Sequence, residues 1–280
     1  MIKKLRNHGF ETDKMFYTIA EIGINHNGDL DNAKKMIDSA ERSNANSVKF
    51  QTYITEKRVS KDSPIYDILK KCEFSFEKFE ILKKHAEDQN IHFFSTPFDK
   101  ESVEFLSEIN CNIFKIASFD MTNYELLRNI SETNTPTIMS TGMCNLEEIR
   151  SAYEIISSNH NNIAILHCIS AYPTLPFDAN LSAIFKLKSE FDCVIGQSDH
   201  TNDIHVPLYA AAMGAQIIEK HFKIDDNCAD ASVSIDEKQM HNLNSRLDEL
   251  EKILGEGNLE ITPAQANTVQ FRRFSKRENK

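Results

Sequence analysis

The sequence predicts a (β/α)8 barrel, the TIM-barrel fold, from three observations. Eight apolar runs alternate with eight helical patterns, at roughly 25 to 35 residues per unit. The runs are almost continuously apolar, which is typical of parallel strands buried on both faces. The chain has 280 residues, about the length of one such barrel. An open, doubly wound parallel sheet is the alternative architecture that the same alternation allows.

Each predicted strand has an apolar body and a polar end. After a polar arm at residues 1–14, the strands are expected at residues 17–23, 47–52, 91–97, 113–118, 136–142 and 163–168, with two more that begin at Cys193 and Gln216. The last two end in Gln197-Ser-Asp-His200 and Glu219-Lys-His221. Because the active sites of such barrels lie at the carboxyl ends of the strands, these polar ends are the candidate functional residues.

Helical patterns fill the intervals between the strands. They are expected at residues 29–43, 76–90, 100–109, 124–132, 146–157, from about 180, around 210–214 and at 236–254. Residues 55–71 form a charged excursion, interrupted by Pro64, that is too polar to be core. Residues 1–254 are therefore predicted to form the barrel, and residues 255–280 an exit loop followed by a basic tail.

Composition limits the function classes. Lys and Arg total 32 and Asp and Glu total 42, so the net charge is −10, which disfavours non-specific binding to nucleic acid or to an anionic membrane. The six cysteines form no CxxC pair, the N-terminus lacks the apolar core of a signal peptide, and no apolar run approaches the roughly 18 residues of a membrane span. A cytoplasmic protein with reduced thiols is expected, without a nucleic-acid or membrane partner.

His200 and His221 are candidate metal ligands. They end two predicted strands that a short helix joins, and such a right-handed βαβ crossover makes the strands parallel neighbours. Both imidazoles then emerge at the same end of one sheet, within reach of a single metal ion. The alternative is that each is a hydrogen-bonded core histidine, and the spacing alone does not decide between the two.

Polar residues at the other strand ends extend this candidate site. They are Glu21, Lys49, Gln51, Thr96, Lys115, Ser118, Ser140, Ser170, Tyr172 and Ser198. Lys49 and Lys115 lie inside apolar runs, where an ammonium group is costly to bury unless it meets an anion. The hydroxyl groups are donors suited to phosphate or carboxylate oxygens. The site is therefore expected to hold a small polyanion.

Several of these residues also have a structural interpretation. Lys49 and Glu21 are candidates for a structural ion pair inside the barrel, and Ser140 and Ser198 for hydrogen bonds to strand-end backbone groups. Of Glu219 and Lys220, one is expected to point outward or to pair locally. Structural or supporting roles are expected for the remaining histidines considered, His26, His92, His167 and His205.

The combination of side chains predicts a reaction class. Two imidazoles leave several positions open on an octahedral metal, which suits Mn²⁺ or a similar ion acting as a Lewis acid on a carbonyl. Glu21 is the carboxylate available as a base. A dianionic co-substrate and a carbonyl acceptor together indicate condensation of phosphoenolpyruvate with an aldehyde.

At these residues the chain resembles the sialic acid (N-acetylneuraminate) synthases and their legionaminate, pseudaminate and spore-coat relatives. The matching motifs follow one another along the barrel: Ala20-Glu-Ile-Gly-Ile-Asn-His-Asn-Gly28, Val48-Lys-Phe-Gln-Thr52, Ser95-Thr-Pro-Phe98, Phe114-Lys-Ile-Ala-Ser118, Ser140-Thr-Gly-Met143, Tyr172-Pro-Thr174, Ser198-Asp-His-Thr201 and Glu219-Lys-His-Phe222. The resemblance implies a transferase that joins phosphoenolpyruvate to an N-acylated hexosamine, giving a nine-carbon 2-keto acid and phosphate.

The same resemblance implies a role for each residue. His200 and His221 would bind Mn²⁺, with Mg²⁺ or Co²⁺ as alternatives, and Glu21 would activate or orient the attacking water. Gln51, Tyr172 and Asp230 would face the sugar. The residues that would surround phosphoenolpyruvate are Lys49, Thr96, Lys115, Ser118, Ser140 and Ser198.

Departures from the family pattern fall on the sugar side. Ser170 stands where some members have asparagine, Asp120 replaces a frequent glutamate, and Cys228-Ala-Asp-Ala-Ser232 replaces a Gly-Pro-Asp-His segment. The acceptor sugar therefore stays open. Relatives also continue into a small antifreeze-like domain that caps the partner's site in a dimer, and this domain is expected to be absent here. A homodimer is expected, with a separate capping chain as a further option.

Two other functions stay open at this point. One is a phosphoenolpyruvate-dependent synthase of another 3-deoxy-2-keto acid, which would need a phosphorylated sugar and additional basic residues. The other is a non-catalytic barrel subunit that depends on a separate cap. The intact set of buried charges argues against the second, because loss of function would spare the apolar core more readily than these side chains.

Overall fold

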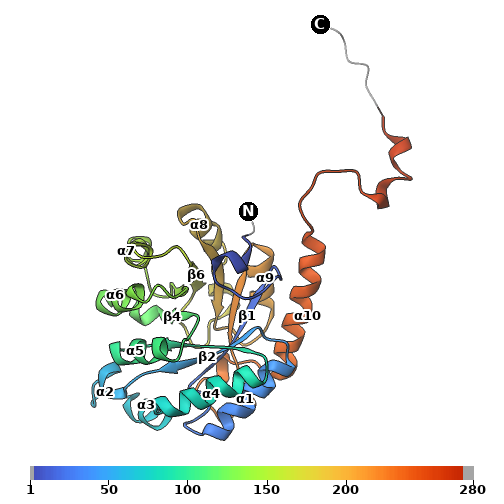
Figure 1. The fold of residues 1–280 in the computed structure, drawn as a ribbon. Coiled ribbons are helices and arrows are strands. Elements are labelled where there is room, and N and C mark those ends of the chain that lie inside the picture. The colour runs from blue at the N-terminus through green and yellow to red at the C-terminus, as the bar shows by residue number, and fades with distance from the viewer. Residues whose placement is uncertain (1–2, 274–280) are drawn as a thin grey trace.

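Eight parallel strands close into a barrel in the computed structural model, which describes residues 3–273 (Figure 1). Each strand pairs with its neighbours in sequence, and β8 pairs with β1. The (β/α)8 prediction is confirmed, and the pairing of β8 with β1 excludes an open sheet. The strands are β1 Tyr17–Gly23, β2 Ser47–Thr52, β3 His92–Pro97, β4 Phe114–Ile116, β5 Thr137–Ser140, β6 Ile163–Cys168, β7 Val194–Asp199 and β8 Ile217–His221.

Helices surround this barrel (Figure 1). Within residues 3–273 a long helix follows each strand, and two short helices, α2 and α3, are inserted after β2. The helices are α1 Leu30–Arg42, α2 Thr55–Arg58, α3 Tyr66–Cys72, α4 Phe76–Asp88, α5 Lys100–Glu108, α6 Tyr124–Glu132, α7 Leu146–Ser157, α8 Ala183–Glu190, α9 His205–Ala212 and α10 Glu237–Leu254. Among the described residues, no helix is long and apolar enough to cross a membrane.

Side-chain caps determine where several helices begin. Asp29 caps α1, because its carboxylate accepts the backbone N–H groups of Asp31 and Asn32. Asp236 caps α10 in a reciprocal capping box with Gln239. These two starts agree with the sequence pattern within a residue, since the capping residue and the first apolar stripe are both local features.

Alternation along the strands separates the apolar core from the site. In β2, Phe50 packs against Phe79 of α4, with ring centroids 6.4 Å apart, so it faces the helix layer. Successive strand residues point to opposite faces, and Lys49 and Gln51 therefore face the barrel interior. The apolar core lies between strands and helices, while the carboxyl ends of the strands bring polar groups together inside.

The excursion after β2 contributes to the core, contrary to the sequence interpretation. Leu69 of α3 is buried and forms a small second cluster with Tyr53 and Phe98. The Tyr53 hydroxyl also donates to the Leu69 carbonyl, 2.9 Å away. The segment is charged overall, but it folds back so that its few apolar side chains cover the mouth of the barrel. Its net polarity therefore did not predict its packing.

The chain leaves the barrel after α10. Residues 255–273 lead away from it and include two 3-10 helices, Pro263–Gln265 and Val269–Phe271 (Figure 1). The end of the predicted basic tail, residues 274–280, lies outside the described residues.

Candidate active site

Strand register brings the acidic and basic candidates together. Glu21 on β1 lies opposite Lys49 on β2 and opposite His221 on β8. Ser198 on β7 lies opposite Glu219 on β8. Because paired residues of parallel strands point to the same face, these five side chains converge at the carboxyl end of the barrel.

Strand β8 sends neighbouring residues to opposite faces. Glu219 and His221 point into the barrel, whereas the Lys220 Nζ lies 2.7 Å from Asp199 Oδ2 on the outer side and donates to the Thr201 carbonyl. Lys220 and Asp199 are both buried. The expectation that one of Glu219 and Lys220 pairs locally is therefore met by Lys220, and Glu219 belongs to the candidate site.

A cavity of about 320 Å³ opens at this end of the barrel. Every predicted site residue lines it except Ser170, which lies beside the wall. The predicted residues in the lining are Glu21, Lys49, Gln51, Thr96, Lys115, Ser118, Ser140, Tyr172, Ser198, His200, His221 and Asp230.

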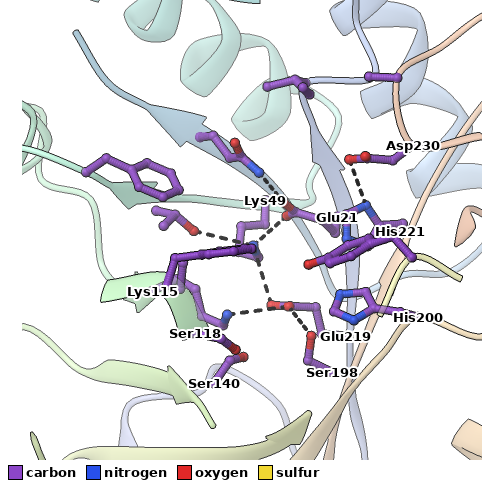
Figure 2. A pocket seen from close by; sticks show the side chains of 18 of the residues that line it. Glu21, Lys49, Lys115, Ser118, Ser140, Ser198, His200, Glu219, His221 and Asp230 are labelled. Atoms are coloured by element: carbon purple, nitrogen blue, oxygen red, sulfur yellow. Dashed lines mark hydrogen bonds and ion pairs between the residues drawn. The ribbon is translucent and has the colours of Figure 1, made fainter. Parts of the chain in front are cut away.

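Two lysines and two glutamates form a connected cluster in the cavity floor (Figure 2). Lys49 Nζ lies 2.6 Å from Glu21 Oε2 and 3.5 Å from Glu219 Oε2. Lys115 Nζ reaches the other oxygen of Glu219 at 3.4 Å, and Ser198 Oγ donates to it at 2.8 Å. The ion pair between Lys49 and Glu21 that was considered as a structural alternative is thus present, inside the cavity.

The surroundings move the pKa values of the two glutamates in opposite directions. Burial raises the pKa of Glu21, and the nearby Lys49 ammonium offsets this only in part. Burial also acts to raise the pKa of Glu219, but Lys115 and Lys49 together lower it to about 2. Of the two carboxyl groups, Glu219 is therefore the one that keeps its negative charge more firmly, and Glu21 is the better proton acceptor.

Hydroxyl groups with unused hydrogen-bonding capacity lie beside the lysines. Within residues 3–273, the buried Oγ atoms of Ser140 and Ser170 have no hydrogen-bond partner. Ser118 Oγ accepts the Gly142 N–H at 2.9 Å. A Cβ on Gly142 would lie 2.1 Å from Ser170 Oγ and 2.9 Å from Ser118 Oγ, so only glycine leaves room for this group of hydroxyls. Buried unpaired hydroxyls of this kind are what an oxyanion would satisfy.

The two histidines present matching ring nitrogens. His200 Nδ1 lies 2.7 Å from the Ile169 carbonyl, which can only accept, so Nδ1 carries the proton and Nε2 has the free lone pair. His221 Nδ1 lies 3.3 Å from Asp230 Oδ2, which favours the same tautomer. The ring centroids are 5.2 Å apart, and Tyr172 covers His200 at 4.2 Å.

This arrangement fits a metal ion held by two imidazoles. A hydrogen bond from the second ring nitrogen to a carbonyl or carboxylate is the usual support of a metal-binding histidine. The described residues contain no group of three or more His, Cys, Asp or Glu side chains that could hold a metal ion by themselves. Substrate or water would have to supply the remaining ligands.

The four histidines for which structural or supporting roles were expected all have structural contacts. The His26 ring stacks on Phe74 at 4.1 Å, and its Nδ1 accepts the Gly28 N–H. His92 Nδ1 and the Tyr17 hydroxyl lie 3.0 Å apart, and His167 Nε2 lies 2.7 Å from the Ala179 carbonyl. His205 begins α9, where its ring stacks near Tyr209.

Sequence reasoning missed several residues that line the cavity. Glu219 is one, although its spacing of two from His221 on a strand was a usable signal. Arg58 is another, because the whole excursion was set aside as polar surface. Phe119, Ile65 and Ile68 form an apolar rim, each about half exposed or more. No local pattern identified them, since they come from loops and short helices.

The sequence model of the NeuB family matches residues 36–259. The chain belongs to the NeuB family. One NeuB relative, the N,N'-diacetyllegionaminic acid synthase of Campylobacter jejuni, is 37% identical over 92% of this chain and 83% of its own length. Another, the human N-acetylneuraminate-9-phosphate synthase, is 32% identical over 89% of this chain and 74% of its own length.

A solved NeuB-type structure has nearly the same architecture. The N-acetylneuraminic acid (sialic acid) synthetase of Leptospira borgpetersenii, crystallised with citrate, matches with a TM-score of 0.91 and 38% identity. The match covers 94% of this chain and 93% of the Leptospira chain. Together these relatives confirm the predicted family and the predicted function class, a nonulosonate synthase.

Proposed function

We propose that the barrel condenses phosphoenolpyruvate with an N-acylated hexosamine, giving a nine-carbon 2-keto acid and inorganic phosphate. The observation that carries the proposal is the buried cluster of Lys49 and Lys115 beside the unpaired Ser140 hydroxyl, at the end of the barrel where the two imidazoles lie. Two buried ammonium groups share two carboxylates there, and donors remain unused. Such a site is suited to a small polyanion.

The two substrates would lie on opposite sides of this cluster. Phosphoenolpyruvate would lie against Lys115, Lys49 and the hydroxyls of Thr96, Ser118, Ser140 and Ser198, all of which line the cavity. The acceptor would lie toward Gln51, Tyr172 and Asp230, with its aldehyde near the imidazoles. This arrangement would bring the nucleophilic C3 of phosphoenolpyruvate next to the carbonyl carbon, which is the main requirement for carbon–carbon bond formation.

His200 and His221 would hold a divalent ion, Mn²⁺ or else Mg²⁺ or Co²⁺, through their Nε2 atoms. When bound, such an ion would supply Lewis-acid activation of the acceptor carbonyl. The chain itself supplies orientation and proton transfer. The Ile169 carbonyl fixes the tautomer of His200, and the Asp230 carboxylate 3.3 Å from His221 Nδ1 would favour the same tautomer of His221.

Glu21 is placed to handle the proton of the attacking water. After C3 of phosphoenolpyruvate bonds to the carbonyl carbon, water adds at C2 and phosphate leaves by cleavage of the C2–O bond. The water proton would pass to Glu21, whose pKa is raised by burial. Gln51 Nε2 donates to Glu21 Oε1 at 3.5 Å, so a hydrogen bond connects this carboxylate to a residue on the proposed sugar side of the cavity.

A screen of phosphate release tests the proposal. Phosphoenolpyruvate and Mn²⁺ are supplied with a panel of N-acylated hexosamines, and a phosphorylated pentose is run in parallel. Release with a hexosamine and formation of a nine-carbon keto acid would support the proposal. Release with the pentose alone would indicate another 3-deoxy-2-keto acid synthase. Phosphoenolpyruvate binding without turnover of any acceptor would instead indicate a non-catalytic barrel subunit.

Activity is expected to fall as the pH is lowered through the histidine range. Burial lowers the pKa of His200, but Cys168 and the Ile169 carbonyl raise it, and the net shift is upward from 6.5. Since a protonated imidazole cannot bind a metal, protons compete with the ion and the loss should begin above pH 6.5. Rate profiles at several Mn²⁺ concentrations check this: the acid midpoint should move to lower pH as Mn²⁺ rises. An acid midpoint that stays at the same pH at every Mn²⁺ concentration would contradict the expectation.

A further inference from the structure

Arg58 lies in the cavity wall, at the end of α2. Its guanidinium carbon lies 3.6 Å from the centroid of the Phe98 ring and 4.7 Å from that of Tyr53. Nη1 donates to Gln51 Oε1 at 2.8 Å. The guanidinium therefore makes cation–π contacts with both rings, and N–H groups beyond the one bonded to Gln51 are left for further hydrogen bonds.

This cation has no close countercharge. Within residues 3–273, Arg58 forms no ion pair, and the acidic groups of Asp120, Glu21 and Asp230 act on it only through space. Burial lowers the pKa of Arg58, and these distant charges do not restore it. Arg58 is half-buried, and a guanidinium withdrawn from water in this way and bound to one neutral amide is costly unless an anion joins it.

The position of Arg58 identifies which substrate would bring the anion. Gln51 links it to the reaction centre, because Gln51 contacts Arg58 through Oε1 and Glu21 through Nε2. Lys49 and Lys115 already serve the phosphoenolpyruvate side. Arg58 therefore lies on the acceptor side of Gln51.

We propose that Arg58 is a specificity-determining residue that binds an anionic substituent, a phosphate or carboxylate, on the acceptor sugar. The proposal rests on the proposed function. A guanidinium fork matches the paired oxygens of either group in two parallel hydrogen bonds, which a neutral hydroxymethyl group cannot accept in the same way. The acceptor class would then be an acidic N-acylated hexosamine, and a neutral one would be a poor substrate.

Three acceptors that differ only at C6 test this proposal. They are N-acetylmannosamine, its 6-phosphate and the corresponding 6-carboxylate, and kcat/KM is measured for each with phosphoenolpyruvate and Mn²⁺. One of the charged acceptors is expected to exceed the neutral one by about 30-fold, the contribution of one or two charged hydrogen bonds. In Arg58→Met, which keeps an apolar stem against Phe98, this ratio should fall to about 3 or less. Arg58→Lys should be intermediate, because it keeps the charge but not the fork.

Lys61→Met is the matched control, since it removes the same charge from an exposed residue of the same excursion. It should leave the ratio unchanged. Equal kcat/KM for all three acceptors in the unmodified protein, a preference for the neutral one, or a preference that survives in Arg58→Met would each overturn the proposal.

Calorimetric binding of the same three sugars, without phosphoenolpyruvate, separates this proposal from the proposed function. If no acceptor is turned over but a charged sugar binds through Arg58, the synthase assignment fails and the Arg58 assignment stands. If hexosamines are turned over without any charge preference, the synthase assignment stands and the Arg58 assignment fails. If the charged sugars bind no better than the neutral one and no sugar reacts, both fail.

Discussion

Replacing His200 or His221 by alanine is expected to stop turnover while leaving the barrel folded. The two imidazoles are the candidate metal ligands, and each is held by a partner that leaves Nε2 available. If the imidazoles hold a metal ion that acts as a Lewis acid, its contribution of several kcal/mol would correspond to about a 1,000-fold or larger fall in kcat when it is lost. Chelation should have the same effect, and Mn²⁺ should reverse it only in the unmodified protein.

Metal content measured by mass spectrometry must fall together with the rate in both variants. His205→Ala is the matched control, because His205 lies at the start of α9 and not in the cavity lining. It should retain both metal and activity. Native rates after complete chelation, or in either alanine variant, would remove the metal from the mechanism.

Lys115→Met is expected to raise KM for phosphoenolpyruvate by about 100-fold, with a small effect on stability. The side chain is buried in the cavity floor, and its ion-pair partner Glu219 keeps Ser198 at 2.8 Å and Lys49 at 3.5 Å when Lys115 is removed. Glu219 is therefore not left without a partner. Burial lowers the pKa of Lys115, and repulsion from the Lys49 ammonium lowers it further, although the Glu219 carboxylate acts in the opposite direction. Removing Lys115 also removes this repulsion between the two ammonium groups.

Lys220→Met provides the matched control on the opposite face of β8. Lys220 is fully buried and pairs with Asp199 at 2.7 Å, outside the cavity. Its removal leaves Asp199 with fewer partners, so the free energy of unfolding should fall by about 3 kcal/mol or more while KM changes little. Melting temperature and KM measured on both variants decide the assignment. A large loss of stability with unchanged KM in Lys115→Met would make Lys115 structural.

Much of the barrel was predictable because its signals are local. The apolar runs of β1, β2 and β6 end where the sequence pattern ends, and helices α6 and α7 have the predicted bounds. The fourth strand is shorter than expected, Phe114–Ile116, because Ser118 begins a 3-10 turn, Ser118–Asp120. That turn keeps Ser118 in the cavity lining while the chain leaves the sheet.

The site was predictable where a polar residue interrupts an apolar strand. Lys49, Lys115 and Glu21 could be recognised without coordinates, since burying their charges requires partners and the carboxyl ends of parallel strands must meet. Ser170 differs from the other predicted residues, because it lies beside the cavity and is absent from its lining, although its buried Oγ has no hydrogen-bond partner. One residue in a loop can point either way without any change in the sequence pattern.

Only the tertiary structure decided which of Glu219 and Lys220 faces the cavity. Both follow an apolar run, and a shift of one residue in register would exchange them. The pairing of Ser198 with Glu219 and of Asp199 with Lys220 settles the choice. The position of Arg58 in the cavity wall could not be predicted for a different reason. It depends on how residues 55–71 pack through Leu69 against Tyr53 and Phe98. Such long-range packing leaves no periodic signal in the sequence, so only the tertiary structure showed that Arg58 lines the cavity.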